Sequence, residues 1–314
     1  MKCLVTGAAG FIGSSLVQRL VSEGYDVRGI IHRTQPTYFN KRVEYVSGNI
    51  TDPVFLKSVL DQVDVVFHCA AFVKDFGPES VFNQINIEGT KNLIEASEAS
   101  LVKKFIFLSH IRYESGKNSG FYHKTKAIAE QILMEKYTHN QFPVVIIRPG
   151  NVYGPGATTW VLRPLQAIQK NRIALIDKGT GIFLHTYIEN LIDALIGTLK
   201  ETQAVGEIID ITDGVNTTTW GDYLNALAKM AGKPPIQRNM SKRTALIVGK
   251  LMMVGYNLFK IEPWVTPVAV EIFTNQNTVS IEKAKNFLEY SPKINFAEGL
   301  KQVERWLKAE RYIT

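Results

Sequence analysis

Three glycines, spaced three residues apart, follow the first strand-like segment of the chain. The apolar run Cys3–Thr6 leads directly into Gly7-Ala8-Ala9-Gly10-Phe11-Ile12-Gly13, where the amphipathic stretch Gly13–Glu23 begins. So tight a turn from strand to helix requires positive φ and small residues, which also let the backbone approach an anionic ligand closely. The helix start offers unpaired N–H groups and a partial positive charge to phosphates. The pattern predicts a dinucleotide site; its alternative is a glycine turn that merely joins strand to helix.

The first half of the chain alternates short strand-like segments with longer helix-like segments. The strand-like segments are apolar on both faces, as strands buried between two layers of helices are. This alternation predicts an α/β fold, a doubly wound parallel sheet (Rossmann) in residues 1–150. The expected strands are Cys3–Thr6, Val27–Ile31, Val43–Val46, Val63–Cys69, Phe105–Leu108 and Val144–Arg148, and the expected helices are Gly13–Glu23, Pro53–Gln62, Phe82–Ala99 and Phe121–His139.

After about residue 150 the pattern becomes irregular. We expect residues 151–314 to form a smaller, partly helical C-terminal substrate lobe, with segments that return to the sheet. The expected elements are helices at Arg163–Lys170, Leu191–Lys200, Trp220–Ala231, Ser280–Leu288 and Phe296–Arg311, with a strand at Ile208–Thr212.

Composition excludes several other classes of protein. Lys and Arg number 36 against 29 Asp and Glu, a net charge of +7. These basic residues are dispersed, so nucleic acid is not an expected partner, although the excess suits a phosphorylated cofactor or a membrane surface. Two cysteines exclude a disulfide scaffold, and we expect Cys3 and Cys69 to be buried free thiols. The six histidines show no metal-ligand spacing, so no metal site is predicted.

One long apolar segment lies in the second half of the chain. Ala245–Phe259 is interrupted by Lys250 and falls short of the roughly 20 residues that a membrane-spanning helix needs. We interpret Leu246–Phe259 as a core helix, as part of an apolar ligand site, or as a peripheral membrane attachment aided by Lys242, Arg243 and Lys250. The N-terminus shows no signal-peptide pattern, so a cytoplasmic enzyme is expected.

A series of short motifs resembles the extended short-chain dehydrogenase/reductase superfamily, also called the NAD-dependent epimerase/dehydratase family. The resemblance covers nearly the whole chain. It rests on the glycine turn and, in the family's order, on Gly48-Asn49-Ile50-Thr51-Asp52, His68-Cys69-Ala70-Ala71, Asn86-Ile87-Glu88-Gly89-Thr90, Tyr122-His123-Lys124-Thr125-Lys126, Arg148-Pro149-Gly150-Asn151-Val152-Tyr153-Gly154 and Lys283-Ala284-Lys285-Asn286-Phe287-Leu288-Glu289-Tyr290-Ser291-Pro292. It implies a nicotinamide-dependent oxidoreductase, and family members often form homodimers.

The end of the second expected strand distinguishes NAD from NADP. An acidic residue there would hold the ribose 2′-OH of NAD, whereas an Arg would accommodate the 2′-phosphate of NADP. Asp26 lies at the wrong end of strand Val27–Ile31, and the strand is followed by His32 and Arg33 with no acid before Glu44. We therefore predict NADP, with NAD as the alternative, and place Arg33 and His32 beside the 2′-phosphate.

The resemblance implies further cofactor contacts. Asn49 takes a position where an Asp commonly meets the adenine amino group, and an Asn oxygen can accept the same hydrogen bond. The residues that match cofactor-binding positions of the family are Gly7, Gly10, Phe11, Ile12, Gly13, Asn49, Ile50, Ala70, Ala71, Tyr122, Lys126, Pro149, Gly150 and Val152.

Tyr122 and Lys126 form the candidate catalytic pair. Four residues apart at the start of a helix, they project on one face, where the ammonium could lower the pKa of the phenol from its usual ~10. In the family the tyrosine is the general acid/base and the lysine also holds the nicotinamide ribose. The usual third member, a Ser or Thr, aligns most naturally with His110, one place after Ser109. Three interpretations stay open: Ser109 takes the role, His110 polarises the substrate oxygen, or the protein binds cofactor with little catalysis.

The pocket residues favour an apolar substrate. Where nucleotide-sugar enzymes of the family carry an Arg-Asp pair, this chain has Phe183 and Leu184, which cannot neutralise a diphosphate. The segment Tyr187-Ile188-Glu189-Asn190-Leu191 looks more like the branch containing 3β-hydroxysteroid dehydrogenases, sterol dehydrogenases and dihydroflavonol reductases. The candidate substrate contacts are Phe72, Asn151 and His185.

We therefore expect hydride transfer at a secondary alcohol or ketone of a small, fairly apolar molecule. The alternatives are a nucleotide-sugar epimerase or dehydratase and a dinucleotide-binding regulatory protein with a degenerate catalytic site.

Overall fold

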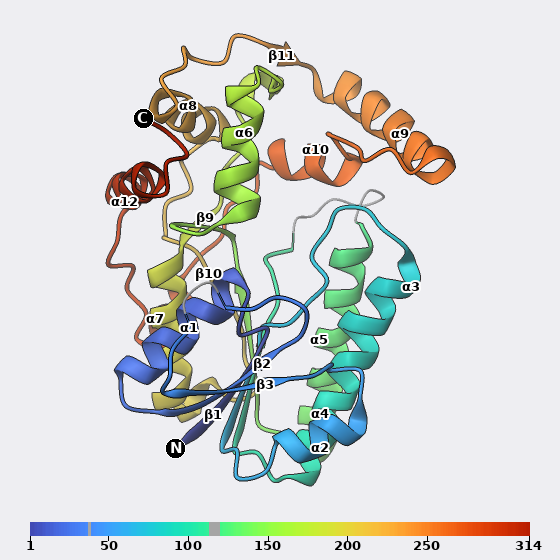
Figure 1. The fold of residues 1–314 in the computed structure, drawn as a ribbon, viewed down its shortest axis with the longest axis vertical. Helices are drawn as coiled ribbons and strands as arrows, with labels where there is room; N and C mark the ends of the chain where they lie inside the picture. The colour runs from blue at the N-terminus through green and yellow to red at the C-terminus, as the bar shows by residue number, and fades with distance from the viewer. Residues whose placement is uncertain (37–38, 113–119) are drawn as a thin grey trace.

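The computed structural model describes residues 1–36, 39–112 and 120–314. Within them, a seven-stranded sheet has the strand order β10-β6-β5-β4-β1-β2-β3, and every neighbouring pair is parallel (Figure 1). The strands are β1 (Lys2–Thr6), β2 (Asp26–Ile31), β3 (Val43–Ser47), β4 (Val65–His68), β5 (Lys104–Leu108), β6 (Val144–Pro149) and β10 (Ile208–Ile211). The strand order reverses between β1 and β4, which confirms the predicted doubly wound α/β fold.

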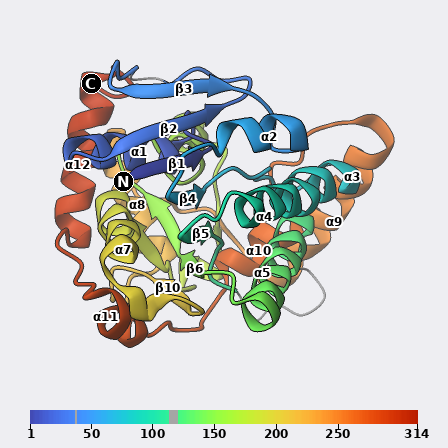
Figure 2. The ribbon, with the colours of Figure 1, turned by 90° about the horizontal axis from the view of Figure 1, so that it is seen from below.

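Two layers of helices bury the sheet. Figure 2 shows α1 (Phe11–Ser22) and α7 (Ile188–Lys200) on one side, with α2 (Pro53–Val59), α4 (Gly89–Ala99) and α5 (Phe121–Asn140) on the other. Because both faces are covered, the central strands are apolar throughout; Cys3, Leu4 and Val5 of β1 are fully buried.

The prediction of one continuous helix over Phe82–Ala99 is wrong. The structure has a short α3 (Glu79–Phe82), then a π-helical segment Asn83–Glu88, and only then α4. The wider π turn lets the segment place Asn86 and Ile87 in the interior, which explains why its apolar residues follow the 3.6-residue period poorly.

The C-terminal half contributes to the sheet and also builds a lobe above it. Strand β10 pairs with β6, and α7 covers the sheet beside α1. Figure 1 shows the lobe over the carboxyl ends of the strands. Its elements are α6 (Arg163–Gln169), α8 (Trp220–Met230), α9 (Lys242–Phe259), α10 (Pro267–Phe273) and the short pair β8 (Leu175–Ile176) and β11 (Asn239–Met240). The remaining strands and α-helices are the pair β7 (Asn151–Tyr153) and β9 (His185–Tyr187), with α11 (Glu282–Leu288) and α12 (Phe296–Ala309).

Helix α9 corrects the interpretation of the apolar segment as a core helix. Only Ala245 and Gly249 of this helix are buried, and five of its large apolar side chains are exposed to solvent: Ile247, Leu251, Val254, Leu258 and Phe259. No helix in the described parts of the chain combines the length and apolarity needed to cross a bilayer.

The glycine turn has the geometry that its sequence predicts. Gly7 has a φ of +68°, and its carbonyl oxygen accepts a hydrogen bond of 2.9 Å from the Gly10 N–H. A Cβ atom at Gly13 would lie 2.2 Å from the Gly7 oxygen. Gly7 therefore supplies the left-handed conformation, and Gly13 lets α1 start directly against the turn.

We expect Gly13→Ala to destabilise the protein by about 1–3 kcal/mol, because the added methyl group would force the turn away from α1. Urea unfolding followed by circular dichroism measures the difference. Gly255→Ala in α9 is the matched control, since a Cβ there meets no atom within 4 Å. It should leave stability unchanged or raise it by about 1 kcal/mol. A Gly13→Ala variant as stable as the wild type would contradict the packing described here.

Candidate active site

A cavity of about 730 Å³ lies between the carboxyl edge of the sheet and the lobe. This volume suits a small organic molecule, and the position is where open α/β sheets bind ligands. From the sheet and its helices, the lining residues are Phe11, Ile12, Cys69, Ala71, Leu108, Ser109, His110, Ile111, Tyr122, His123, Pro149, Gly150, Asn151 and Val152. Residues Trp160, Arg163, Trp264 and Phe273 are among those that line it from the lobe.

The start of α1 fits a dinucleotide phosphate. Its N-cap residue is Gly10, which has no side chain to accept a hydrogen bond from the first N–H groups of the helix. Those groups and the helix dipole are therefore directed at the space that the glycine turn leaves open. The adjoining Phe11 and Ile12 line the cavity, so a phosphate held here would lie beside it.

A buried hydrogen-bond network holds the glycine turn against the loop after β4. His68 lies between two hydroxyl groups, with Nδ1 2.8 Å from Thr6 Oγ1 and Nε2 2.9 Å from Thr90 Oγ1. Thr6 Oγ1 also accepts a hydrogen bond of 3.0 Å from the Ala70 N–H. Burial lowers the pKa of His68 to about 3, so the ring is neutral. His68 is therefore a positioning residue that couples strands β1 and β4.

Asn86 connects the same loop to the helix that carries the candidate catalytic pair. Its Oδ1 accepts a hydrogen bond of 2.8 Å from the Phe72 N–H. Its Nδ2 donates to the Phe72 carbonyl and, at 3.0 Å, to Thr125 Oγ1 on α5. The π-helical segment that interrupts the expected helix thus fixes α5 relative to β4.

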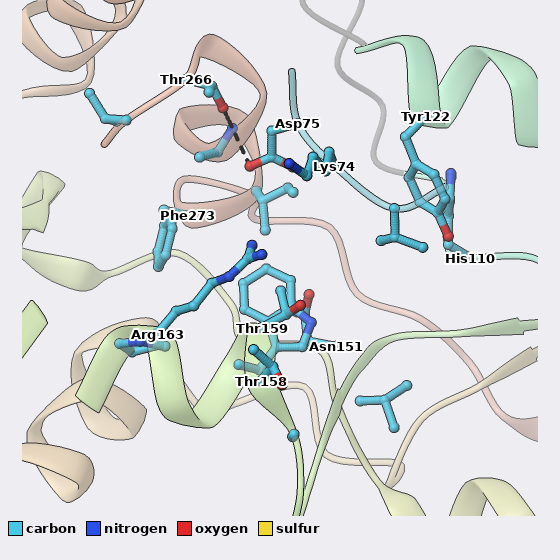
Figure 3. A pocket seen from close by; sticks show the side chains of 18 of the residues that line it. Lys74, Asp75, His110, Tyr122, Asn151, Thr158, Thr159, Arg163, Thr266 and Phe273 are labelled. Atoms are coloured by element: carbon cyan, nitrogen blue, oxygen red, sulfur yellow. Dashed lines mark hydrogen bonds between the residues drawn. The ribbon is translucent and has the colours of Figure 1, made fainter. Parts of the chain in front are cut away.

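Tyr122, His110 and His123 form an aromatic cluster at one end of the cavity. The ring centroids of His110 and Tyr122 are 5.2 Å apart, and those of His110 and His123 are 4.4 Å apart. Figure 3 shows Tyr122 beside His110, with Asp75 and Arg163 in another part of the pocket. The cavity therefore has one end that carries the candidate acid/base groups and a separate part with charged side chains.

The hydrogen bonds of His110 define which of its nitrogens is available. Nδ1 lies 2.9 Å from the Ile111 carbonyl oxygen, which can only accept, so Nδ1 carries the proton. Burial, with a smaller effect of His123, lowers the pKa of His110 to about 3 and keeps the ring neutral. Nε2 is buried and has no hydrogen-bond partner among the described residues. His110 Nε2 therefore carries a lone pair that no described residue uses.

Ser109 lies near the buried carboxylate of Glu130, but its hydroxyl makes no hydrogen bond to a described residue. Burial opposes ionisation of Glu130, but the Arg148 guanidinium holds the pKa of this carboxyl group below its usual range. Arg148 Nε donates to Glu130 Oε1 at 2.8 Å, and Arg112 also donates to this carboxylate. The His110 ring, in contrast, packs directly against the Tyr122 ring.

Lys126 is enclosed in the interior beneath Tyr122. Its side chain is almost fully buried, and Nζ lies 3.7 Å from the centroid of the Phe107 ring, a cation–π contact. Desolvation lowers the pKa of Lys126 to about 7, with Glu130 and Cys69 opposing the shift. The amine can therefore gain or lose a proton near neutral pH.

The expectation that Lys126 lowers the pKa of Tyr122 is corrected by the structure. Burial raises the pKa of the Tyr122 phenol well above its usual value, and no other cause contributes. The physical reason is that burial removes the phenolate from water, and no attraction to Lys126 offsets that cost. Tyr122 is therefore a proton donor in this state of the protein.

The remaining predicted cofactor residues lie along the carboxyl edge of the sheet. His32 and Arg33 are exposed just after β2, whose Ile30 is paired with Thr6, the residue before the glycine turn. Asn49 Oδ1 accepts a hydrogen bond of 3.1 Å from the Thr51 N–H, which occupies one of its two lone pairs. Ile50 is buried against Gly89.

Of the three predicted substrate contacts, the structure brings only Asn151 into the cavity lining. Phe72 packs against Phe82, with ring centroids 4.8 Å apart. His185 is fully buried, with Nδ1 2.7 Å from Asp213 Oδ2 and Nε2 3.1 Å from Thr218 Oγ1. His185 thus has a structural role: it links β9, of which it is the first residue, to the segment after β10.

Phe183 and Leu184, the apolar pair from which we argued against a nucleotide-sugar substrate, also lie in the core. Phe183 stacks on Tyr223 at a centroid distance of 4.2 Å and packs against Trp220. Leu184 is buried too. These side chains are therefore not evidence about the polarity of the cavity.

Sequence reasoning missed charged lining residues, among them Asp75 in the loop after β4 and Arg163 in the lobe. Asp75 and Arg163 line the cavity, and Thr266 Oγ1 donates a hydrogen bond of 3.5 Å to Asp75. Burial raises the pKa of Asp75, although Arg163 opposes the shift. Asp75, Arg163 and Thr266 are far apart in the sequence and belong to no motif, so no local pattern could have predicted them. His123 also lines the cavity, and its position next to Tyr122 could have indicated this. No group of His, Cys, Asp and Glu able to hold a metal occurs in the described ranges.

We expect the stability of a Lys126→Met variant to depend on pH in a defined way. Between pH 7 and the ordinary lysine pKa of 10.5, the unfolded chain binds a proton at Lys126 that the folded chain lacks. The free energy of unfolding of the wild type therefore rises with pH over this range. The full destabilisation from burying the charged lysine is present only below pH 7. In dinucleotide-free buffer, the stability of Lys126→Met relative to wild type should fall by about 2 kcal/mol from pH 7 to 9.

Urea unfolding at both pH values tests this expectation. The control is Lys57→Met at an exposed position of α2, for which the difference from wild type should stay constant. A constant difference for Lys126→Met as well would show that Lys126 is not desolvated.

Comparison with known proteins places this geometry in a family. The NAD dependent epimerase/dehydratase family matches residues 3–212. The chain is 26% identical to a decarboxylating sterol-4-alpha-carboxylate 3-dehydrogenase of Mus musculus, over 96% of this chain and 89% of that protein. It is also 26% identical to a 2-alkyl-3-oxoalkanoate reductase of Stenotrophomonas maltophilia, over 97% and 98% of the two chains.

A solved structure shows the same fold. The UDP-glucuronic acid 4-epimerase from Bacillus cereus, in complex with UDP-glucuronic acid and NAD, has a TM-score of 0.78 and 26% identity, covering 99% of this chain and all of that one. The matched family model, these relatives and the glycine turn agree. The chain belongs to the NAD dependent epimerase/dehydratase family and is an NAD(P)-dependent oxidoreductase of the extended short-chain dehydrogenase/reductase type.

Proposed function

We propose that this protein is an NADP-preferring oxidoreductase that acts at a secondary alcohol or ketone of a small, fairly apolar molecule. The observation that carries the proposal is the placement of Tyr122 and His110 together in a large cavity beside the start of α1. The named activities of the sterol dehydrogenase and of the oxoalkanoate reductase support the same substrate class.

The roles of the catalytic residues follow from their protonation. A bound nicotinamide supplies or accepts the hydride. Tyr122, kept protonated by burial, donates its proton to the carbonyl oxygen of a ketone and takes it back from the alcohol in the reverse direction. The neutral His110 ring packs against the Tyr122 ring and so positions the phenol for this proton transfer. Lys126, one helical turn after Tyr122, holds a proton that can be exchanged near pH 7.

The preference for NADP is proposed from the exposed end of β2. Arg33 and His32 follow the strand next to the glycine turn, and the acidic residue of this strand, Asp26, begins it at the opposite edge of the sheet. A guanidinium group matches the geometry and charge of a 2′-phosphate.

A nucleotide-sugar epimerase is the second candidate, and one observation favours it. Arg163 and Arg172 line the cavity, where either could bind a diphosphate. The two functions differ in their use of cofactor. A reductase consumes NADPH with each turnover, whereas an epimerase turns over without net consumption of cofactor.

We expect Arg33→Ala to weaken NADPH binding by about tenfold or more while leaving NADH binding nearly unchanged, because only the phosphorylated cofactor loses a charge-assisted contact. Tryptophan quenching titrations with both cofactors measure the effect. Arg42→Ala, an exposed arginine just before β3 at the opposite edge of the sheet, is the matched control. Equal losses for NADPH and NADH, or tighter NADH binding by the wild type, would contradict the NADP assignment.

For catalysis, we expect Tyr122→Phe to lower turnover by about 10²–10⁴-fold without loss of NADPH binding, because it removes only the exchangeable proton. NADPH oxidation with a panel of apolar ketones, including a 2-alkyl-3-oxoalkanoate and a 3-oxosteroid, provides the assay. His110→Ala should lower turnover more than Ser109→Ala. The reverse order would assign the third catalytic position to Ser109, and full activity of Tyr122→Phe would refute the proposed acid/base role.

A further inference from the structure

Helix α9 presents an apolar stripe to solvent. Ile247, Leu251, Val254 and Leu258 recur at spacings of four, three and four residues, which places them on one face of the helix. Their side chains are 61%, 66%, 54% and 68% exposed, respectively. In a soluble protein an aligned row of large exposed apolar side chains indicates an interaction surface.

The opposite face of α9 is anchored to α10 of the lobe and to the loop after β4. Gly249 lies against the backbone of Thr266 and Pro267 at the start of α10, where a Cβ would approach within about 3.1 Å. The Tyr256 ring packs edge-on against Phe76, with centroids 5.0 Å apart. Figure 1 shows α9 at the outer edge of the molecule, with α10 on its inner side. The stripe is therefore held in a fixed outward orientation.

The apolar surface continues past the end of the helix. Phe259, Ile261 and Trp264 are 73%, 61% and 67% exposed. Other exposed apolar residues of the described chain, such as Val54 and Leu101, lie in separate parts of the sequence. Aromatic side chains such as that of Trp264 are favoured where an apolar medium meets water.

The charges on α9 are all of one sign. Residues 242–260 contain Lys242, Arg243, Lys250 and Lys260 and no acidic residue. Lys242 is paired with Glu271 of α10, whereas the other three basic residues are exposed. Glu262 follows just beyond this segment. A basic helix with an exposed apolar face is complementary to an anionic lipid surface.

We propose that α9 and the segment Phe259–Trp264 form a docking surface for the face of an anionic lipid bilayer. The helix lies in the plane of the headgroups, with Ile247, Leu251, Val254 and Leu258 inserted among the acyl chains. Arg243 and Lys250 contact the anionic headgroups.

Docking in this orientation would bring the cavity to the membrane. Residues 262–266, which follow α9 directly, form part of the cavity wall. An apolar molecule dissolved in the bilayer would then lie next to the cavity that is proposed to bind it. The docking surface itself does not depend on the proposed reaction, because its test requires no turnover.

Vesicle flotation of the full-length protein tests the proposal. The wild type should float with phosphatidylcholine vesicles that contain a third of phosphatidylglycerol and much less with vesicles of phosphatidylcholine alone. Leu251→Ser combined with Leu258→Ser should lower the bound fraction by about tenfold or more, because two large side chains no longer leave water. Arg243→Gln combined with Lys250→Gln should lower binding to anionic vesicles by about tenfold.

Matched controls separate docking from general surface effects. Val54→Ser combined with Leu101→Ser changes two apolar residues that are 80% and 85% exposed, and it should leave flotation unchanged. Tryptophan emission should shift to the blue on vesicle binding, and Trp264→Phe should remove most of that shift.

Two outcomes would overturn the proposal. One is equal flotation of the wild type with both kinds of vesicle or with neither. The other is a dimer in sedimentation velocity that the Leu251→Ser/Leu258→Ser variant converts to monomer while vesicle binding stays absent, since this face would then bind a second copy of the chain. Circular dichroism of each variant verifies that the fold is intact.

Discussion

Parallel pairing of the central strands is the constraint on which the rest of the structure depends. Because β1, β4, β5 and β6 run in one direction and in a common register, their carboxyl ends meet at one edge of the sheet. The glycine turn, the loop with Ala70, the residues Ser109 and His110, and the segment from Pro149 each follow one of these ends. The cavity forms where these connections meet the lobe.

Burial sets the chemistry of this site more strongly than attraction between charges does. Tyr122, Lys126 and His110 each lie in a water-poor environment, and in each case desolvation favours the neutral form. The result is a phenol that holds its proton, an amine that titrates near pH 7 and an imidazole with a free lone pair. Proton exchange at a substrate oxygen requires such a combination of donor and acceptor.

Sequence patterns predicted the sheet well, because two-sided burial leaves a clear signal in each strand. They failed where tertiary packing overrides local pattern. The π-helical segment before α4 is shaped by Asn86, whose side chain bonds to Phe72 and Thr125 rather than to its own helix. His185 and Phe183 were given meanings for the pocket, but both side chains turn into the aromatic core of the molecule. Helix α9 has the composition of a core helix, and only its packing on α10 shows that one face is left uncovered.

By itself, the sequence determined the α/β class, the dinucleotide turn and the candidate catalytic pair. Each of these depends on the spacing of residues that lie close together in the chain. Only the tertiary structure decided which side chains face the cavity, that His110 presents an acceptor, and that Tyr122 stays protonated. Those properties depend on burial and on contacts between segments far apart in the chain. Local sequence contains no record of such contacts, because solvation of a side chain is set by whatever the fold packs around it.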